Sequence, residues 1–164
     1  MPRQGKPSFP VDPQLDVNGL ILLLAGVPEW VTYVQANQTS GLSYNLATQA
    51  EFLAQGKGGQ AQLAALENQY GIRLIQDISR TEIDAAVGRL QGAFSGDPLR
   101  RVLREADARV AASAFLKNED LATSDLQFFK RAKDLGLKVE FVGSGRAAAL
   151  AAAYQPRPVM IPGP

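Results

Sequence analysis

The sequence predicts an α/β fold in which helices flank a central parallel sheet. Strand-like stretches alternate with helix-like stretches along most of the chain, and their spacing leaves room for a helical crossover between successive strands. Hydrophobic residues make up 46% and charged residues 20%, which is typical of a globular domain. A chain of 164 residues is also long enough to bury a core without disulfides.

The strands are expected at short apolar stretches, namely 15–17, 41–44, 72–75, 120–123 and 138–142. An apolar helix follows the first strand, and Pro28 opens the next helix, because its missing N–H costs nothing at the first helical position. Asn45 is a helix cap, and Ser79 with Glu82 forms a capping box. Further helices are expected over 61–70, from Asp97-Pro98 to Lys117, over 126–135 and over 145–154.

The chain divides into a core domain and two terminal segments. Residues 1–14 contain four prolines and predict an extended lead-in, and residues 15–142 carry the strand–helix alternation. Residues 143–164 combine an alanine-rich helix with a proline-rich tail, and we expect this tail to cover the surface of its own domain rather than to dock on a partner.

The composition excludes several kinds of chemistry. The sequence has no cysteine and no histidine, so it forms no disulfide, no Cys/His zinc site, no thiol nucleophile and no Ser-His-Asp triad. Its net charge of +1 does not indicate a nucleic-acid partner and does not exclude one. The apolar run 20–27 is far shorter than the roughly 20 residues that a membrane span needs. It is preceded by Asp12 and Asp16, whereas a signal peptide carries positively charged residues before its apolar segment. We therefore expect a cytoplasmic protein without a membrane partner.

Two aspartates follow predicted strands, at the edge where parallel α/β sheets place their functional crevice. Asp16 comes after Leu15 at the end of the first strand, and Asp125 follows the strand 120–123. Each could simply be the N-cap of the helix after it. Two carboxylates at the same sheet edge, however, are also the arrangement of a metal site.

Two further acids lie on predicted helices. Glu51 has apolar neighbours, although a lone glutamate on a helix is usually solvated. Asp107 shares one helix face with Val110, Ala111 and Ala114, so it lies on the side that packs inward. An inward carboxylate needs a partner, which is either a salt bridge within the core or a bound cation.

In this order and these contexts, the four acids resemble those of the PIN domain, the fold of VapC-type toxin nucleases and related RNA-specific nucleases. The resemblance covers about residues 15–142. It rests on Leu15-Asp16-Val17-Asn18, on the segment 43–53 with Glu51, on the helix beginning Asp107-Ala-Arg-Val, and on Leu121-Ala-Thr-Ser-Asp125.

The resemblance implies a PIN-like three-layer sandwich and a metal-dependent endoribonuclease, a toxin that an antitoxin or immunity protein holds inactive. Oxygen ligands without histidine or cysteine favour Mg²⁺ or Mn²⁺, which would activate water and neutralise charge on the scissile phosphate. Asp16, Asp107 and Asp125 are the expected ligands, and Glu51 is either a fourth ligand or acts through a water. Orienting roles fall to Asn18 and to Thr123 or Ser124.

Other readings of the sequence remain open. Arg100, Arg101 and Arg104 cluster on the expected helix from Asp97-Pro98 to Lys117, either as a solvated face or as a rim that contacts RNA phosphates. The domain could be a catalytically silent PIN-like interaction module. A phosphoryl-transfer receiver domain is a third reading, but the lysine it needs at the last strand end is missing. A homodimer is compatible with the sequence.

Overall fold

The computed structural model describes residues 13–39 and 41–164, so most of the expected lead-in lies outside the described residues. The strands are β1 (Gln14–Leu15), β2 (Leu42–Tyr44), β3 (Ile72–Leu74), β4 (Leu121–Thr123) and β5 (Val139–Phe141). The helices are α1 (Val17–Leu24), α2 (Pro28–Ala36), α3 (Leu46–Ala54), α4 (Gln60–Tyr70), α5 (Arg80–Gly92), α6 (Glu105–Lys117), α7 (Leu126–Asp134) and α8 (Gly145–Ala153).

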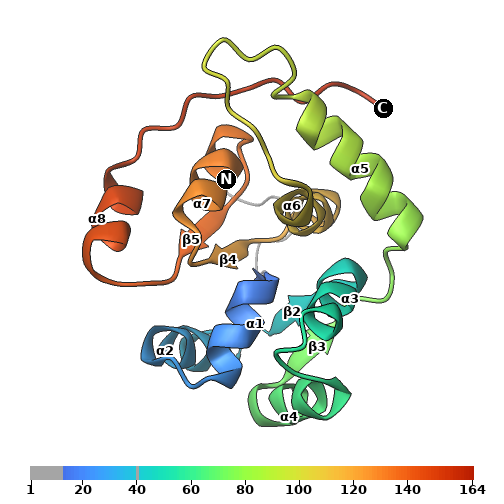
Figure 1. Cartoon of the computed structure of the whole chain (residues 1–164), viewed down its shortest axis with the longest axis vertical. Coiled ribbons are helices and arrows are strands. Elements are labelled where there is room, and N and C mark those ends of the chain that lie inside the picture. Colours follow the sequence, from blue (N-terminus) through green and yellow to red (C-terminus); the bar gives the residue numbers. More distant parts are fainter. Residues whose placement is uncertain (1–12, 40) are drawn as a thin grey trace.

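All paired strands are parallel, in the order β3-β2-β1-β4-β5. This confirms the predicted α/β class with a parallel sheet between helices (Figure 1). The order differs from the 2-1-3-4-5 arrangement of receiver-type folds, so the receiver alternative is wrong.

The core lies on the two faces of the sheet. One buried cluster is formed mainly by side chains of α5, α6 and α7, and the other mainly by side chains of α1 to α4. Leu121 belongs to the first cluster and its neighbour Ala122 to the second, because successive side chains of a strand point to opposite faces. The result is the three-layer arrangement of helices, sheet and helices.

Side-chain caps begin several helices as the sequence predicts. Asn45 accepts a 2.8 Å hydrogen bond from the amide of Thr48 at the start of α3. Ser79 and Glu82 exchange the two bonds of a capping box at α5, with lengths of 3.1 and 2.9 Å. These local bonds fix where each helix starts, and so they fix the direction in which it leaves the sheet.

The expected long helix from Asp97-Pro98 to Lys117 is wrong in its first part. Residues 97–104 form a loop, and α6 starts only at Glu105. Arg100 has a φ of +56°, which no helix accommodates, and the Asp97 carboxylate accepts 2.7 and 2.9 Å bonds from the amide and Nε of Arg101. These bonds fold the segment into a turn at the point where a helix was expected.

The C-terminal segment packs back onto the domain, as expected of the tail. It runs from α8 across to α5 (Figure 1), where Nε of Arg89 donates a 3.0 Å bond to the carbonyl of Pro162. Val159 and Ile161 pack against the cluster of α5, α6 and α7. This segment is therefore part of the folded domain.

In the described part of the chain, no single helix is long and apolar enough to cross a membrane. Among the helices that the structure describes, only α1 and α2 taken together reach the necessary length and composition, and a bend of 106° separates them. Both helices also contribute buried residues such as Leu20 and Trp30 to the core.

Candidate active site

Asp16 lies at the carboxyl end of β1 and is almost completely buried, with 6% of its surface exposed. Its Oδ1 accepts a 2.7 Å hydrogen bond from the amide of Gly19, so it caps α1. Its Oδ2 accepts a 2.7 Å hydrogen bond from the hydroxyl of Thr123. A buried carboxylate with both oxygens held in this way has a fixed orientation.

Asp125 follows the neighbouring strand β4 and is tied to the same hydroxyl. Its amide donates a 3.0 Å hydrogen bond to Oγ1 of Thr123, and its carboxylate accepts a 3.1 Å bond from the amide of Phe128. Because β1 pairs with β4, Thr123 links the two strand ends and the two aspartates. Both acids are thus N-caps and neighbours at the carboxyl edge of the sheet, as the sequence indicated.

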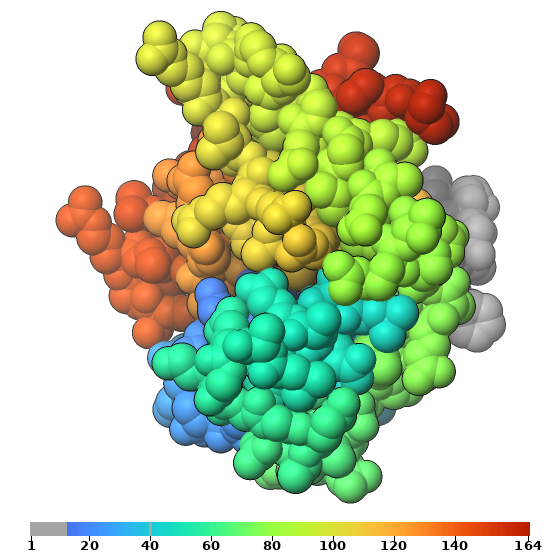
Figure 2. Space-filling view, turned by 45° about the vertical axis from the view of Figure 1, so that its right-hand side comes forward, coloured from blue at the N-terminus to red at the C-terminus, as the bar shows by residue number. Residues whose placement is uncertain are grey.

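Helices α3 and α6 bring the other two acids to this edge. The two helices meet on the face shown in Figure 2, and Nδ2 of Asn45 donates a 3.3 Å bond to the carbonyl of Arg109 between them. Asp16, Asn18, Glu51 and Asp107 then line one small cavity of about 40 Å³. Three segments that are distant in sequence converge there.

Burial and the neighbouring acids raise the proton affinity of Asp107 and of Asp16. The pKa of Asp107 is raised to about 7, mainly by burial and then by the charges of Asp125, Asp16 and Glu51, while Arg104 opposes the rise. Burial raises the pKa of Asp16 to about 6, Asp125 adds to this, and the hydrogen bonds from Thr123 and Gly19 oppose it. The four carboxyl groups therefore share one electrostatic environment.

The donor chemistry of this cluster fits a hard divalent cation, since it offers carboxylate oxygens in a partly buried pocket. Among the residues that the structure describes, however, no three acidic side chains gather as tightly as a bound ion requires. Three of the four acids, Asp16, Glu51 and Asp107, line the common cavity.

The two candidate orienting hydroxyls have different partners. Thr123 donates to Asp16, whereas Ser124 accepts a 2.6 Å bond from Nε1 of Trp30 and donates to the carbonyl of Val142. Ser124 therefore holds α2 and β5 together and does not bond to any of the four acids. Asn18 is exposed and lines the cavity beside Asp16.

Gly19 and Asn45 are site residues whose roles the sequence did not reveal. Gly19 donates to Asp16, and a Cβ atom there would lie 2.7 Å from the ring of Trp30. A glycine three residues after a capping aspartate is the available signal, but the contact with Trp30 appears only in three dimensions. Asn45 was expected only as a cap, and its bond to α6 is likewise a tertiary contact.

The three arginines that were expected on one helix lie in or beside the loop 97–104, in different environments. The Arg101 side chain is 10% exposed and forms ion pairs with Asp97, at 2.9 Å, and Asp134, at 3.1 Å, so it is not part of a solvated face. Arg100 and Arg104 are exposed. Arg104 precedes α6 directly, and its charge reaches Asp107.

Comparison with known proteins gives matches in structure alone: no protein-family model and no curated protein matches this sequence. A chain in the structure of VapBC2 from Rickettsia felis bound to a promoter DNA fragment is 18% identical, with a TM-score of 0.60 over 78% of this chain and 96% of that one. This chain has a PIN-like, VapC-like fold.

Two further structures agree on the fold. A chain of a toxin–antitoxin complex from Klebsiella pneumoniae is 22% identical and has a TM-score of 0.54, over 72% of this chain and 90% of that one. A chain of FitAcB from Neisseria gonorrhoeae is 18% identical and has a TM-score of 0.51, over 77% and 94%. The PIN-like three-layer sandwich expected from the sequence is thereby confirmed.

Proposed function

We propose that this protein is a metal-dependent endoribonuclease and acts as a toxin that a cognate antitoxin or immunity protein neutralises. The observation that carries the proposal is the convergence of Asp16, Glu51, Asp107 and Asp125 at the carboxyl edge of a PIN-like sheet. Burying mutually repelling carboxylates is costly, and a divalent cation removes that cost.

In this proposal Asp16, Asp107 and Asp125 hold Mg²⁺ or Mn²⁺, with Glu51 as a further ligand or a partner of the attacking water. The ion would activate water and neutralise charge on the scissile phosphate. Thr123 keeps the Asp16 carboxylate in one orientation through its 2.7 Å bond. Because the sequence has no histidine, the general-base role would fall to a carboxylate or to the water on the ion itself.

Two features support the partner and the substrate. The solved structures with this fold include a complex described as toxin–antitoxin, which favours a protein antitoxin. The exposed Arg100 and Arg104 lie in and beside the loop that leads to Asp107, where a polyanion would approach the acids. RNA is the substrate class that the resemblance of the sequence implies.

Cleavage of single-stranded RNA tests the proposal. The wild type should cut in the presence of Mg²⁺ or Mn²⁺ and stop when EDTA is added, and Asp16→Asn should be inactive. Asp84→Asn, which alters an exposed acid on α5, is the matched control and should cut normally. Equal cleavage by the wild type and Asp16→Asn, or full cleavage in EDTA, would contradict the mechanism.

A silent PIN-like interaction module is the second candidate. Asp16 and Asp125 both already serve as helix caps, and no three acids among the described residues are as close as a filled metal site requires. Calorimetric titration with Mn²⁺ separates the two candidates. Saturable binding that Asp107→Asn abolishes supports the nuclease, and absence of binding supports the module.

A further inference from the structure

A second hollow lies between the loop 97–104, α7 and the C-terminal segment. Its volume is about 560 Å³, and its walls include Leu99, Arg101, Lys130, Leu150, Tyr154 and Arg157. We call it the tail groove, because Tyr154 and Arg157 come from the segment that follows the last strand.

The tail groove is connected to the acidic site through two elements. Gln127, two residues after Asp125 in the first turn of α7, lines the groove. On the opposite wall, the loop that carries Leu99 and Arg101 continues through Arg104 into α6 and Asp107. Helix α7 and the loop 97–104 therefore both lead from the acidic residues to the groove.

The groove is positively charged. Four cationic side chains line it, and none of its lining residues that the structure describes is acidic. Arg101 and Arg131 both form ion pairs with Asp134, which does not itself line the groove. Lys130 and Arg157 have no carboxylate partner in the described part of the chain, so their charges are available to a ligand. Nζ of Lys130 lies 5.6 Å from the centre of the Tyr154 ring.

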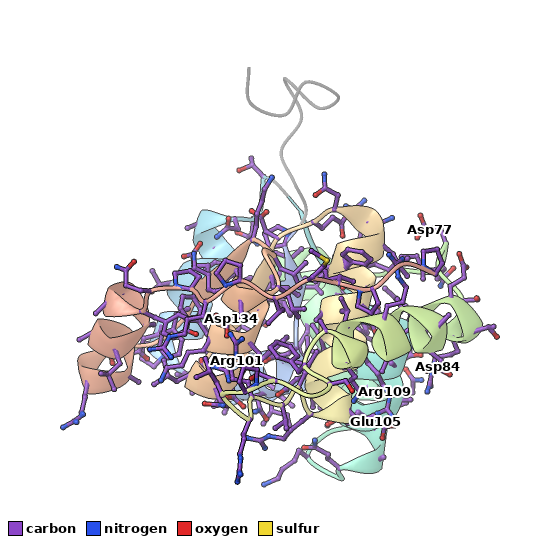
Figure 3. The ribbon with its side chains drawn as sticks, turned by 90° about the horizontal axis from the view of Figure 1, so that it is seen from above. Asp77, Asp84, Arg101, Glu105, Arg109 and Asp134 are labelled. Atoms are coloured by element: carbon purple, nitrogen blue, oxygen red, sulfur yellow. The ribbon has the colours of Figure 1, made fainter. Side chains whose placement is uncertain are left out.

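Buried contacts fix the groove in place. Asp134 accepts a 2.7 Å bond from the hydroxyl of Tyr154 and a 2.8 Å bond from the amide of Arg157. Arg101 donates a 2.5 Å bond to the carbonyl of Arg157, and Figure 3 shows Arg101 and Asp134 beside one another under the C-terminal segment. The backbone of Arg157 is therefore anchored, while its exposed side chain is free to bind.

We propose that the tail groove binds the phosphodiester backbone of the RNA strand beside the cut, with Lys130 and Arg157 as the phosphate contacts. This inference rests on the proposed nuclease function. The two available cations match the charge of a strand that the acidic site would cleave. Leu99 and Leu150, which are 48% and 43% exposed, offer apolar contacts to unpaired bases, so the groove suits a single strand.

RNA binding by full-length Asp16→Asn, which holds the strand without cutting it, tests the groove. The probe is a labelled single-stranded RNA, titrated at several salt concentrations. Adding Lys130→Ala and Arg157→Ala should weaken binding at least tenfold and reduce the salt slope by about 1.4, since each phosphate contact on a single strand contributes about 0.7. Lys130→Arg should retain most of the affinity.

The matched control is Lys133→Ala, which removes a cation from the same helix, over the ring of Phe129 and outside the groove. It should leave the affinity and the salt slope unchanged. Melting temperatures of all variants establish that they are folded. An equal loss of affinity with Lys133→Ala would overturn the groove proposal, because general charge would then explain the binding.

The failure of the groove proposal can be told apart from failure of the nuclease proposal. If Asp16→Asn binds RNA and its salt slope is unchanged by the double substitution, only the groove proposal is wrong. If RNA binding is unchanged but the double substitution abolishes binding of poly-glutamate, the groove takes an acidic peptide and the proposal is overturned. If Asp16→Asn does not bind RNA and the wild type does not cut it, the nuclease proposal itself is wrong.

Discussion

The hydroxyl of Thr123, at the end of β4, donates a 2.7 Å hydrogen bond to Oδ2 of Asp16, at the end of β1. The same hydroxyl accepts a 3.0 Å bond from the amide of Asp125. One side chain therefore orients the two aspartates at adjacent strand ends. It also lowers the pKa of Asp16, partly offsetting the rise that burial causes.

Thr123→Val tests this relationship, because it keeps the shape of the side chain and removes the hydroxyl. Asp16 would keep a buried oxygen without a donor, so we expect a loss of roughly 1–3 kcal/mol in the free energy of unfolding. We also expect RNA cleavage to fall at least tenfold. Denaturant unfolding and cleavage assays measure the two effects.

Two controls accompany Thr123→Val. Thr123→Ser keeps the hydroxyl and should retain most of the activity. Ser124→Ala removes the neighbouring hydroxyl, which bonds to Trp30 and Val142. It should lower stability while leaving the metal requirement intact. If Ser124→Ala impaired cleavage as strongly as Thr123→Val, the bond to Asp16 would not be the cause.

The raised pKa of Asp107 predicts an unusual dependence of stability on pH. In the unfolded chain this carboxyl group ionises near pH 4, and in the folded protein near 7. The folded state therefore favours the protonated form, and its contribution to stability is lost as pH rises from about 4 through 7. Asp97, whose pKa is held at about 2 by Arg101, stays ionised in this range and does not interfere.

We expect the metal-free wild type to lose roughly 1–2 kcal/mol of unfolding free energy between pH 5 and pH 8, a value reduced for the partial exposure of Asp107. Asp107→Asn should be more stable than the wild type at pH 8 and depend less on pH. Asp77→Asn, an exposed acid paired with Lys117, should retain the pH dependence of the wild type. Parallel curves for wild type and Asp107→Asn would mean that Asp107 ionises normally.

Local signals made much of the fold predictable from the sequence. The caps Asp16, Asn45 and Asp125 and the capping box at Ser79 depend on residues three positions apart, so the sequence reveals them directly. The parallel sheet follows from the strand–helix alternation. The acids at the strand ends could be predicted because the topology places those ends at one edge.

The parts that the sequence misplaced depend on distant partners. Asp97-Pro98 is a good helix start, but Arg101 pairs with Asp134, which is 33 residues further along the chain, and the loop 97–104 bends to allow it. For the same reason, the sequence left Arg101 open as a solvated residue or an RNA contact and did not indicate its ion pair with Asp134. Nothing within one turn of Arg101 indicates that partner.

Gly19 offers a prediction with a matched internal control. A methyl group at Gly19 would lie 2.7 Å from the ring of Trp30, so Gly19→Ala should lower the free energy of unfolding by roughly 1–3 kcal/mol through overpacking. Gly88 lies within α5, and a Cβ atom there would meet nothing within 4 Å. Gly88→Ala should therefore raise stability by roughly 0.5–1 kcal/mol.

Denaturant unfolding of the two glycine variants measures both changes. Because Gly19 also donates to Asp16, Gly19→Ala should reduce cleavage as well, whereas Gly88→Ala should not. If Gly19→Ala raised the free energy of unfolding as Gly88→Ala does, the close approach of Gly19 to Trp30 would not exclude a methyl group, and the prediction would be wrong.

The pair of Arg101 and Asp134 predicts a large loss of stability when one partner is removed. The Asp134 side chain is fully buried and lies 3.1 Å from Arg101 and 3.3 Å from Arg131. Asp134→Asn would leave buried positive charge without its partner, so we expect a loss of about 3 kcal/mol or more in the free energy of unfolding.

The control for the buried pair is an ion pair at the surface of the protein. Arg109 pairs with Glu105 on α6 (Figure 3). The Glu105 side chain is 71% exposed, so Glu105→Gln should cost less than about 1 kcal/mol. Deleting residues 155–164 should also lower the melting temperature, because it removes the amides that bond to Asp134 and its backbone carbonyl, together with the apolar contacts of Val159 and Ile161. A melting temperature unchanged by the deletion, with partner binding lost, would instead make this segment a docking element.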